Sequence, residues 1–252
     1  MKRAYLGAAL FAAFTLHGAS AVAVPAVPEE GGWSGFINIG IGAGSSESNL
    51  LAELFGQDLG DDTISSLDSG PDDEDVALPA AQFEAAYTFS DLDMQLFLGN
   101  RPRDHIVMDL DLPAETKAGV RQDISGVGTA EFALGFSTVA TDVWKDPYIV
   151  DASRSNTEMT SAGLNVAWYR IFDSGFGVTY LSTEIELDDE RSGRNGDLGL
   201  SRAEQRDLRR EGQYKRWDVT WDWRINERHR LVPGIGYIDA DFDGDAMAED
   251  GP

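Results

Sequence analysis

Most of the chain alternates between apolar and polar residues with a period of two. In the stretch from Lys215 to Asp245, one parity carries the apolar residues Trp217, Val219, Trp221, Trp223 and Ile225. Charged or polar residues occupy the other parity. Successive side chains of a β-strand leave opposite faces of the sheet, so this pattern predicts strands with one apolar and one polar face.

The same alternation recurs along the chain and predicts nine strands. They start near Trp33, Ala80, Leu92, His105, Val127, Thr160, Gly175, Gln213 and His229. Residues 105–123, which surround Pro113, also admit two strands, which would make ten. The parity changes near Ser182, which indicates a bulge or a strand end. Short turns are expected at 90–91, 122–125, 173–175 and 226–228. They alternate with longer connections at 45–78, 142–157 and 189–211 and a brief one near 101–104, as in an up-and-down antiparallel barrel.

The long connections are polar. Residues 56–76 carry eight acidic residues and no basic one, which predicts a solvated loop. Residues 201–212 differ, because Ser201 and Glu204 have the spacing of a capping box and Gly212 is a suitable helix stop. A short helix is therefore expected at about 202–210.

The N-terminus has the features of a secretory signal peptide. Lys2 and Arg3 precede an apolar run, and the small residues Ala19, Ala21 and Ala23 follow it. We expect residues 1–23 to be removed on export and residues 24–252 to form one barrel domain. A short buried N-terminal helix is the alternative.

Composition narrows the classes of protein further. The chain has no cysteine, which excludes a disulfide scaffold and an anchor on a lipidated cysteine. Its net charge of −24 argues against nucleic acid, because phosphate binding needs clustered Lys and Arg. Such a charge on an exported protein suits solubility and contact with divalent cations at the acidic loops.

Lipid is the simplest cover for the apolar face. Few apolar helix patterns are present to cover the strands, whereas a closed barrel satisfies its backbone hydrogen bonds internally and can stand in hydrocarbon. The sequence thus predicts an all-β fold, an up-and-down antiparallel transmembrane β-barrel in the outer membrane of a Gram-negative cell. The alternative is a soluble periplasmic β-sandwich that binds a ligand.

The chain is also expected to continue beyond Pro252. Bacterial single-chain barrels have an even number of strands, and nine is odd. The last segment, "DFDGDAMAEDGP", has the composition of an acidic outer loop rather than of a closing strand. We therefore expect one to three further strands, without which the barrel would not be stable.

Several segments resemble a known family. They are "GGWSGFINIGIGAG", "GVRQDISG", "VWKDPYIVDASRSNTE", "LSRAEQRDLRREG" and "DFDGDAMAEDG". Together they are similar to the domain-of-unknown-function family numbered 2860, whose members are exported Gram-negative proteins regarded as outer-membrane barrels. The resemblance spans nearly all of the chain after the signal peptide. It implies the barrel and brings no catalytic residues or ligands.

An acidic cluster near the C-terminus is a candidate metal site. Asp239, Asp241 and Asp243 occupy positions 1, 3 and 5 of an EF-hand-like loop, with Gly244 at position 6 and Asp245 after it. No flanking helices are expected. We favour the other interpretation, a strand with its aspartates inward and with Ile238, Ala240 and Phe242 outward.

Candidates for catalysis are few. His105 lies on the polar parity of its strand near Asp104 and Asp109, and His229 adjoins the turn at 226–228. A barrel lipid hydrolase would need a serine tied to such a histidine, and no spacing provides one. No cofactor motif appears, so we expect a protein that is not an enzyme.

An arginine cluster is the last candidate site. Arg202, Arg206, Arg209 and Arg210 fall on or beside the expected helix of an otherwise acidic chain. They could pair with the acidic loops, or they could face a pore mouth and attract anions. The resulting hypothesis is a narrow channel or a structural barrel, with outer-membrane lipid as its partner.

Overall fold

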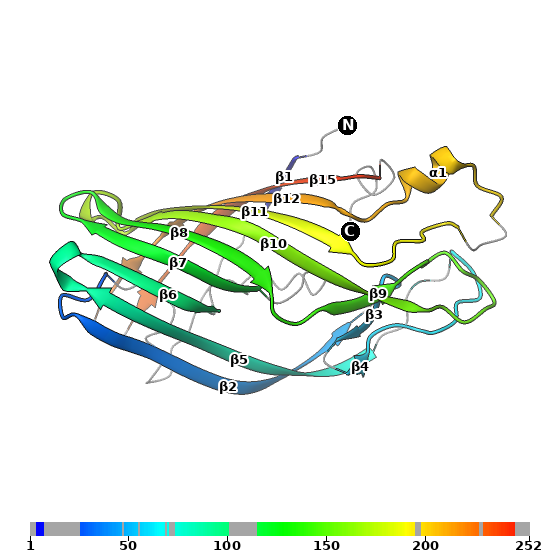
Figure 1. Cartoon of the computed structure of the whole chain (residues 1–252), viewed down its shortest axis with the longest axis horizontal. Helices are drawn as coiled ribbons and strands as arrows, with labels where there is room; N and C mark the ends of the chain where they lie inside the picture. Colours follow the sequence, from blue (N-terminus) through cyan, green and yellow to red (C-terminus); the bar gives the residue numbers. More distant parts are fainter. Residues whose placement is uncertain are drawn as a thin grey trace.

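The computed structural model describes residues 4–7, 26–46, 48–54, 56–68, 70, 74–100, 115–194, 198–226 and 229–244. The described chain is an all-β protein built on one antiparallel, up-and-down sheet (Figure 1). No helix among these residues is both long and apolar enough to cross a membrane.

Among the described residues, nine long strands form the wall of the sheet. They are β2 (Gly32–Ser46), β5 (Glu74–Phe89), β6 (Met94–Asn100), β7 (Glu115–Ile124), β8 (Gly128–Ser137), β10 (Asn156–Tyr169), β11 (Phe176–Leu187), β12 (Gly212–Trp221) and β15 (Gly234–Phe242). Each pairs antiparallel with the next in this order. This arrangement confirms the up-and-down order that the alternation of short and long connections predicts.

Shorter elements complete the described fold. They are β1 (Ala4–Gly7), β3 (Leu51–Leu54), β4 (Gln57–Asp58), η2 (Ser90–Leu92), β9 (Thr141–Trp144), η4 (Ile171–Asp173), α1 (Arg202–Asp207), β13 (Trp223–Arg224) and β14 (Arg230–Leu231). The expected capping box of α1 is present, because Ser201 and Glu204 each bond the backbone of the other. The helix ends at Asp207, short of the expected residue 210.

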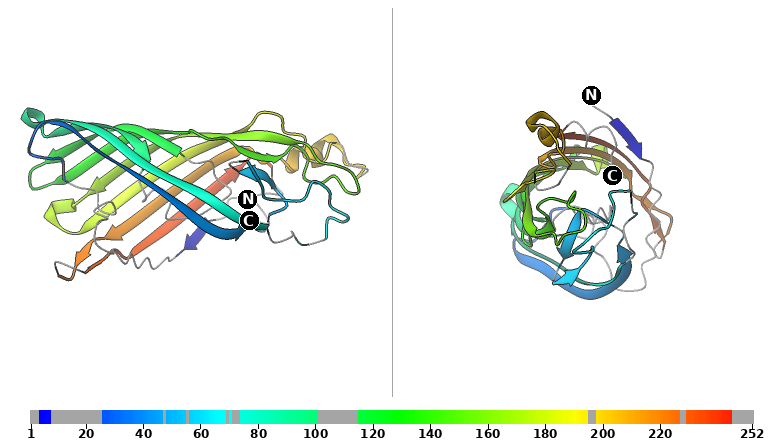
Figure 2. Two further views of the ribbon diagram at one scale, coloured as in Figure 1. Left: turned by 90° about the horizontal axis from the view of Figure 1, so that it is seen from below. Right: turned by 90° about the vertical axis from the view of Figure 1, so that its right-hand side faces the viewer.

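The sheet curls into an incomplete ring (Figure 2). Short connections such as η2 and η4 lie at one end, which we call the turn end; α1, β3, β4 and β9 lie at the other, the loop end (Figure 1). The described sheet is not closed, because β2 ends it on one side and β15, extended by the short β1, ends it on the other.

The outer face of the wall carries a continuous apolar belt. Its exposed members are Trp33, Ile37, Ile39 and Ile41 on β2, Phe89 on β5, Leu96 and Leu98 on β6, Ile124 on β7, Phe132, Leu134 and Phe136 on β8, Val166 and Trp168 on β10, Phe176 on β11, Trp217, Val219 and Trp221 on β12, and Ile235 and Tyr237 on β15. This confirms the predicted apolar face of the tryptophan-rich strand.

The inner face is polar and buried. Its buried polar members include Glu84, Thr88, Gln95, Lys117, Arg121, Thr129, Glu131, Ser161, Asn165 and Thr183. In a water-soluble domain, large apolar side chains are mostly inside and charged side chains are mostly exposed. The described sheet has the reverse distribution, with large apolar side chains exposed on the outer face and charged side chains buried on the inner face.

One strand prediction stays untested and another needs correction. The fourth long strand of the described wall is β7, which begins at Glu115 within the range 105–123 that also admits two strands, and the start of the strand expected at His105 lies outside the described residues. The parity change at Ser182 is not a bulge, because β11 keeps one register with β10 and β12 throughout. Instead, the outer residues of β11 become polar toward the loop end while the inner residues Ile185 and Leu187 become apolar and buried.

The favoured face assignment of the last strand is wrong. Tyr237 lies opposite Trp217, and Asp239 lies opposite Lys215, so these residues share the outer face. Phe242 is inward, where it packs against a buried apolar cluster. The sequence was ambiguous because both faces of this strand carry apolar residues.

The expected signal peptide stays a prediction. Within residues 1–23 only Ala4–Gly7 are described, and they form β1, which pairs antiparallel with Gly236–Asp239 of β15. The small residues of the expected cleavage region lie outside the described residues.

Candidate functional site on the inner wall and at the loop end

The most buried charge on the inner wall is Arg121 of β7, with an exposed fraction of 1%. Its Nε donates to Glu131 Oε2 at 2.6 Å, and its Nη2 donates to Glu84 Oε2 at 2.8 Å. Its Nη1 donates to Gln95 Oε1 at 3.0 Å, and its guanidinium lies 3.6 Å from the centre of the Phe97 ring. We call these five residues the inner-wall cluster. It joins β5, β6, β7 and β8.

Two further charged side chains with hydrogen-bond or ion-pair partners lie along the same strand. Toward the loop end, Glu115 Oε1 accepts hydrogen bonds of 3.2 Å from Ser161 Oγ and Thr183 Oγ1. Toward the turn end, Asp123 forms an ion pair of 2.6 Å with Arg170. Small residues leave room for these side chains, since a Cβ at Gly135 would lie 2.9 Å from Glu115 Oε2. Arg121, Glu115 and Asp123 of β7 are thus all partnered on the inner wall.

A second feature is an apolar cluster at the loop end. It consists of Leu51, Leu59, Val143, Met159, Ile185 and Leu187, with Leu54 and Phe242 packed against it. The connection between β2 and β5 supplies Leu51, Leu54 and Leu59, and β9 supplies Val143. The others are residues of β10, β11 and β15. The prediction of a solvated loop at 56–76 is therefore wrong for Leu59 and Ile64, which are buried.

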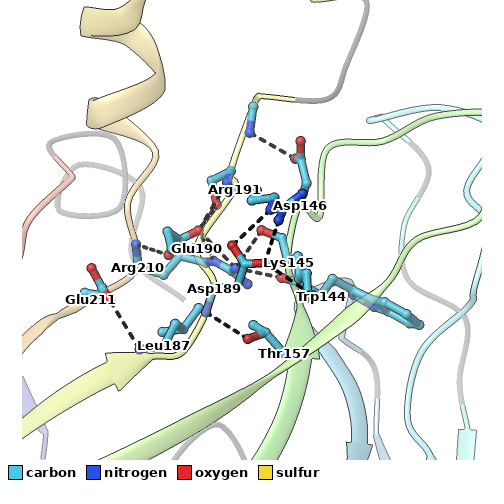
Figure 3. Close-up of polar contacts among 12 residues, drawn as sticks. Trp144, Lys145, Asp146, Thr157, Leu187, Asp189, Glu190, Arg191, Arg210 and Glu211 are labelled. Carbon is cyan, nitrogen blue, oxygen red and sulfur yellow. Dashed lines mark hydrogen bonds and ion pairs between the residues drawn. The ribbon is translucent and has the colours of Figure 1, made fainter.

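The other two long connections are joined by a polar network (Figure 3). Arg210 pairs with Glu190 at 3.1 Å and donates to the backbone carbonyl of Trp144 at 2.6 Å. Asp146 Oδ1 accepts from the backbone N–H groups of Tyr148 and Gly193. Residues 144–148 and 190–210 are thereby held together at the loop end.

Exposed ion pairs flank this network and perturb titration there. Asp189 contacts Lys145 at 3.3 Å and Arg191 at 2.8 Å, and the hydrogen bonds from Arg191 and Lys145 lower the pKa of Asp189. Burial raises the pKa of Tyr148, an effect that the nearby charge of Arg210 partly offsets. Neither shift assigns a catalytic role, because ion-pair networks also perturb pKa values.

Arg154 joins the loop containing β9 to the connection between β2 and β5. Its guanidinium donates to the backbone carbonyls of Asn49, Pro147 and Asp61 and lies 4.5 Å from the ring of Trp144. The side chain is almost fully buried, and burial lowers the pKa of Arg154. Sequence reasoning missed this residue, because a lone arginine in a polar loop has no distinguishing pattern.

The predicted arginine cluster is divided. Arg202 and Arg206 are exposed on α1, Arg209 lies 4.0 Å from Asp243, and Arg210 is buried in the network described above. For the last two, pairing with acidic residues is what the structure shows. Attraction of anions by the pair on α1 stays a prediction.

The predicted acidic cluster does not converge. Asp239 and Asp241 extend from the outer face of β15, Asp243 lies near Arg209, and Asp245 is outside the described residues. Among the described residues, no group of three or more His, Asp or Glu side chains is placed to hold a metal ion.

Of the two histidines considered for catalysis, the structure describes His229 and not His105. His229 is exposed and contacts Asn226 Oδ1 through its backbone N–H and its Nδ1. His105, Asp104 and Asp109 lie outside the described residues. The expectation that the protein is not an enzyme stays a prediction.

Comparison with known protein families shows to which family the chain belongs. The model of the family described as "Protein of unknown function (DUF2860)" matches residues 32–251. The chain belongs to this family, as the resemblance of its segments indicates. No curated protein and no solved structure gives a significant match.

Proposed function

We propose that this protein is an outer-membrane β-barrel whose apolar belt faces lipid. The observation that carries the proposal is the distribution of side chains, with large apolar residues exposed outside and charged residues buried inside. Water would penalise that belt, whereas hydrocarbon would not. Transmembrane barrels have this pattern of apolar-out and polar-in alternation.

The extent of the belt supports the proposal. On β2 the exposed apolar positions run from Trp33 to Ile41. These positions span about 26 Å along the strand, or about 20 Å across a membrane at a tilt of about 40°. That height approaches the ~25 Å band of known transmembrane barrels. Toward the loop end, outer positions such as Glu184 and Glu186 of β11 are acidic and exposed, as expected of a wall that emerges from lipid.

Aromatic residues support the same placement. At the turn end, Trp33, Tyr87 and Phe89 form a chain of edge-to-face contacts. Phe176 and Trp221 stack there with ring centres 4.9 Å apart. Aromatic side chains gather at membrane interfaces, because the rings of Trp and Tyr are apolar in one part and polar in another.

A barrel with a closed or narrow lumen fits the inner face better than a wide channel does. A wide water-filled lumen would leave inward side chains accessible, yet Arg121, Thr183 and Asn165 are buried. The competing roles are a soluble periplasmic protein that binds a ligand and a barrel lipid hydrolase. The exposed belt disfavours the first, and no described residues support the second.

Closure of the barrel is part of the proposal. β2 and β15 both run from the turn end to the loop end, because the first residues of β2 pair near η2 and those of β15 pair near the C-terminus of β12. All-antiparallel closure therefore needs an odd number of strands between them, the first running from the loop end to the turn end. β1 runs in that direction on β15, but it belongs to residues 1–23, which we expect to be removed on export. The expectation of one to three strands after Pro252 stays a prediction, which the intact mass of the protein from its own gene would test.

Cell fractionation tests the proposed location. We expect the protein from its own gene to sediment with outer membranes, to require detergent for extraction and to migrate differently on gels before and after boiling. A soluble protein released with the periplasm, with no shift on boiling, would overturn the barrel and favour the ligand-binding alternative.

A further inference from the structure

The connection between β2 and β5 does not extend away from the sheet. β3 pairs with β9, which in turn pairs with the loop-end part of β10. In the view from the loop end, on the right of Figure 2, β3 and β4 lie inside the ring that the strands of the wall form. The described residues of 48–64 therefore occupy the loop-end mouth of the ring.

Apolar contacts seal this segment against the wall. Leu51 and Leu59, with exposed fractions of 2% and 1%, pack in one cluster with Met159, Ile185 and Leu187. These last three are inward residues of β10 and β11, on the face that is polar farther toward the turn end. Apolar inner residues would be unfavourable if they were exposed to water at the loop-end mouth of the ring. Their placement is therefore consistent with a segment that covers them, either permanently or in a resting state.

Arg154 fastens the segment. Two of the carbonyls that its guanidinium bonds, those of Asn49 and Asp61, belong to residues 48–64. The backbone N–H of Arg154 also donates to the Asp62 carbonyl at 2.8 Å. The contacts of this buried cation are to backbone carbonyls and the Trp144 ring, so release of the segment would leave the guanidinium without most of its acceptors.

We propose that residues 48–54 and 56–64 are a plug that closes the loop end of the lumen and that Arg154 is the latch that holds it. The proposal rests on the proposed barrel and adds a resting state to it. The mouth is closed until the segment is displaced, and passage of any solute through the loop end requires that displacement.

Cysteine accessibility tests the plug, because the chain has no native cysteine. Leu59→Cys places a single thiol in the seal, and Leu67→Cys places one at an exposed position of the same connection. A membrane-impermeant maleimide is added to the folded full-length protein in detergent. We expect Leu67→Cys to react rapidly and Leu59→Cys to react at least tenfold more slowly.

The latch is tested in the Leu59→Cys background. Arg154→Gln should raise the labelling rate of the introduced thiol at least tenfold, because the neutral amide cannot reach the same carbonyls. Arg191→Gln is the matched control, since Arg191 is an exposed loop arginine that pairs with Asp189. It should leave the rate unchanged. If Arg154→Gln does not fold, Arg154→Lys replaces it, with an increase of the same sign expected.

Two results would overturn the proposal. One is fast labelling of Leu59→Cys with Arg154 intact; the other is a rate that Arg154 substitutions leave unchanged in folded protein. The assay does not depend on where the protein resides. A periplasmic location would overturn the proposed function and with it the plug of a lumen, whereas a reactive Leu59→Cys in a membrane protein would overturn the plug alone.

Discussion

The inner-wall cluster makes a quantitative prediction about Arg121. Arg121→Met removes the cation that pairs with both Glu84 and Glu131 in the described wall. Methionine keeps an apolar contact with Phe97 and does not overfill the site. The change therefore isolates the loss of charge from the loss of packing.

The magnitude follows from burial. The side chains of Arg121, Glu84 and Glu131 have exposed fractions of 2%, 6% and 8%. Removing one partner of a buried ion pair costs about 3–5 kcal/mol, because the other charge remains desolvated and unpaired. We expect Arg121→Met to lower the free energy of unfolding by about that amount. Adding Glu84→Gln and Glu131→Gln should recover most of the loss, since neither carboxylate then remains unpaired.

Urea unfolding in detergent, followed by tryptophan fluorescence and by gel mobility without boiling, measures these free energies. A loss below about 1 kcal/mol for Arg121→Met would refute the reasoning, because it would mean that water solvates the cluster in an open lumen. A triple variant as unstable as the single one would refute the charge argument and point to lost hydrogen bonds instead.

Three further predictions concern the outer surface. In the proposed barrel Trp221 lies at the turn end of the belt rather than at mid-membrane, so Trp221→Arg should cost about 1 kcal/mol. Asp222→Asn should have little effect on urea unfolding, and the opposite ranking would invert the face assignment. A tag inserted near Gly196, which precedes α1 in the chain, should be detected on intact cells, and detection only after the outer membrane is opened would contradict loops at the cell surface. The backbone N–H of Ser201, and to a lesser extent its side chain, lower the pKa of Glu204, so the capping box should contribute fully above the unfolded-state pKa and be lost as the pH falls through the lowered value. In an NMR titration, Ser201→Ala removes only the side-chain part and should raise the Glu204 midpoint part of the way toward its unfolded-state value; a fall in the midpoint would contradict this origin.

Local patterns in the sequence determined the strands and their faces. Alternation requires only neighbouring residues, so Trp33 to Ile41 and Trp217 to Trp221 could be assigned to one outer face from the sequence alone. The capping box of α1 was predictable for the same reason, because Ser201 and Glu204 lie three residues apart. Family membership also followed from segments of the sequence.

Strand alternation failed where both parities carry similar residues. On β15, the sequence allows either Ile235 and Tyr237 or Ile238 and Phe242 to face outward. The pairing of β15 with β12 shows that Ile235 and Tyr237 do. The apparent shift at Ser182 has a related cause. β11 passes from the belt into the plugged mouth, so the apolar side of the strand changes while its geometry does not.

Contacts between distant residues were decided only by the tertiary structure. Arg121 meets Glu84, 37 positions away, and Arg154 meets the carbonyl of Asn49, 105 positions away. Neither partner can be read from spacing, because many acidic residues and every backbone carbonyl are chemically equivalent candidates for an arginine. The sequence by itself thus determined the amphipathic wall, whereas the curl of the sheet decided which charges share the inner wall and which loop segment lies in its mouth.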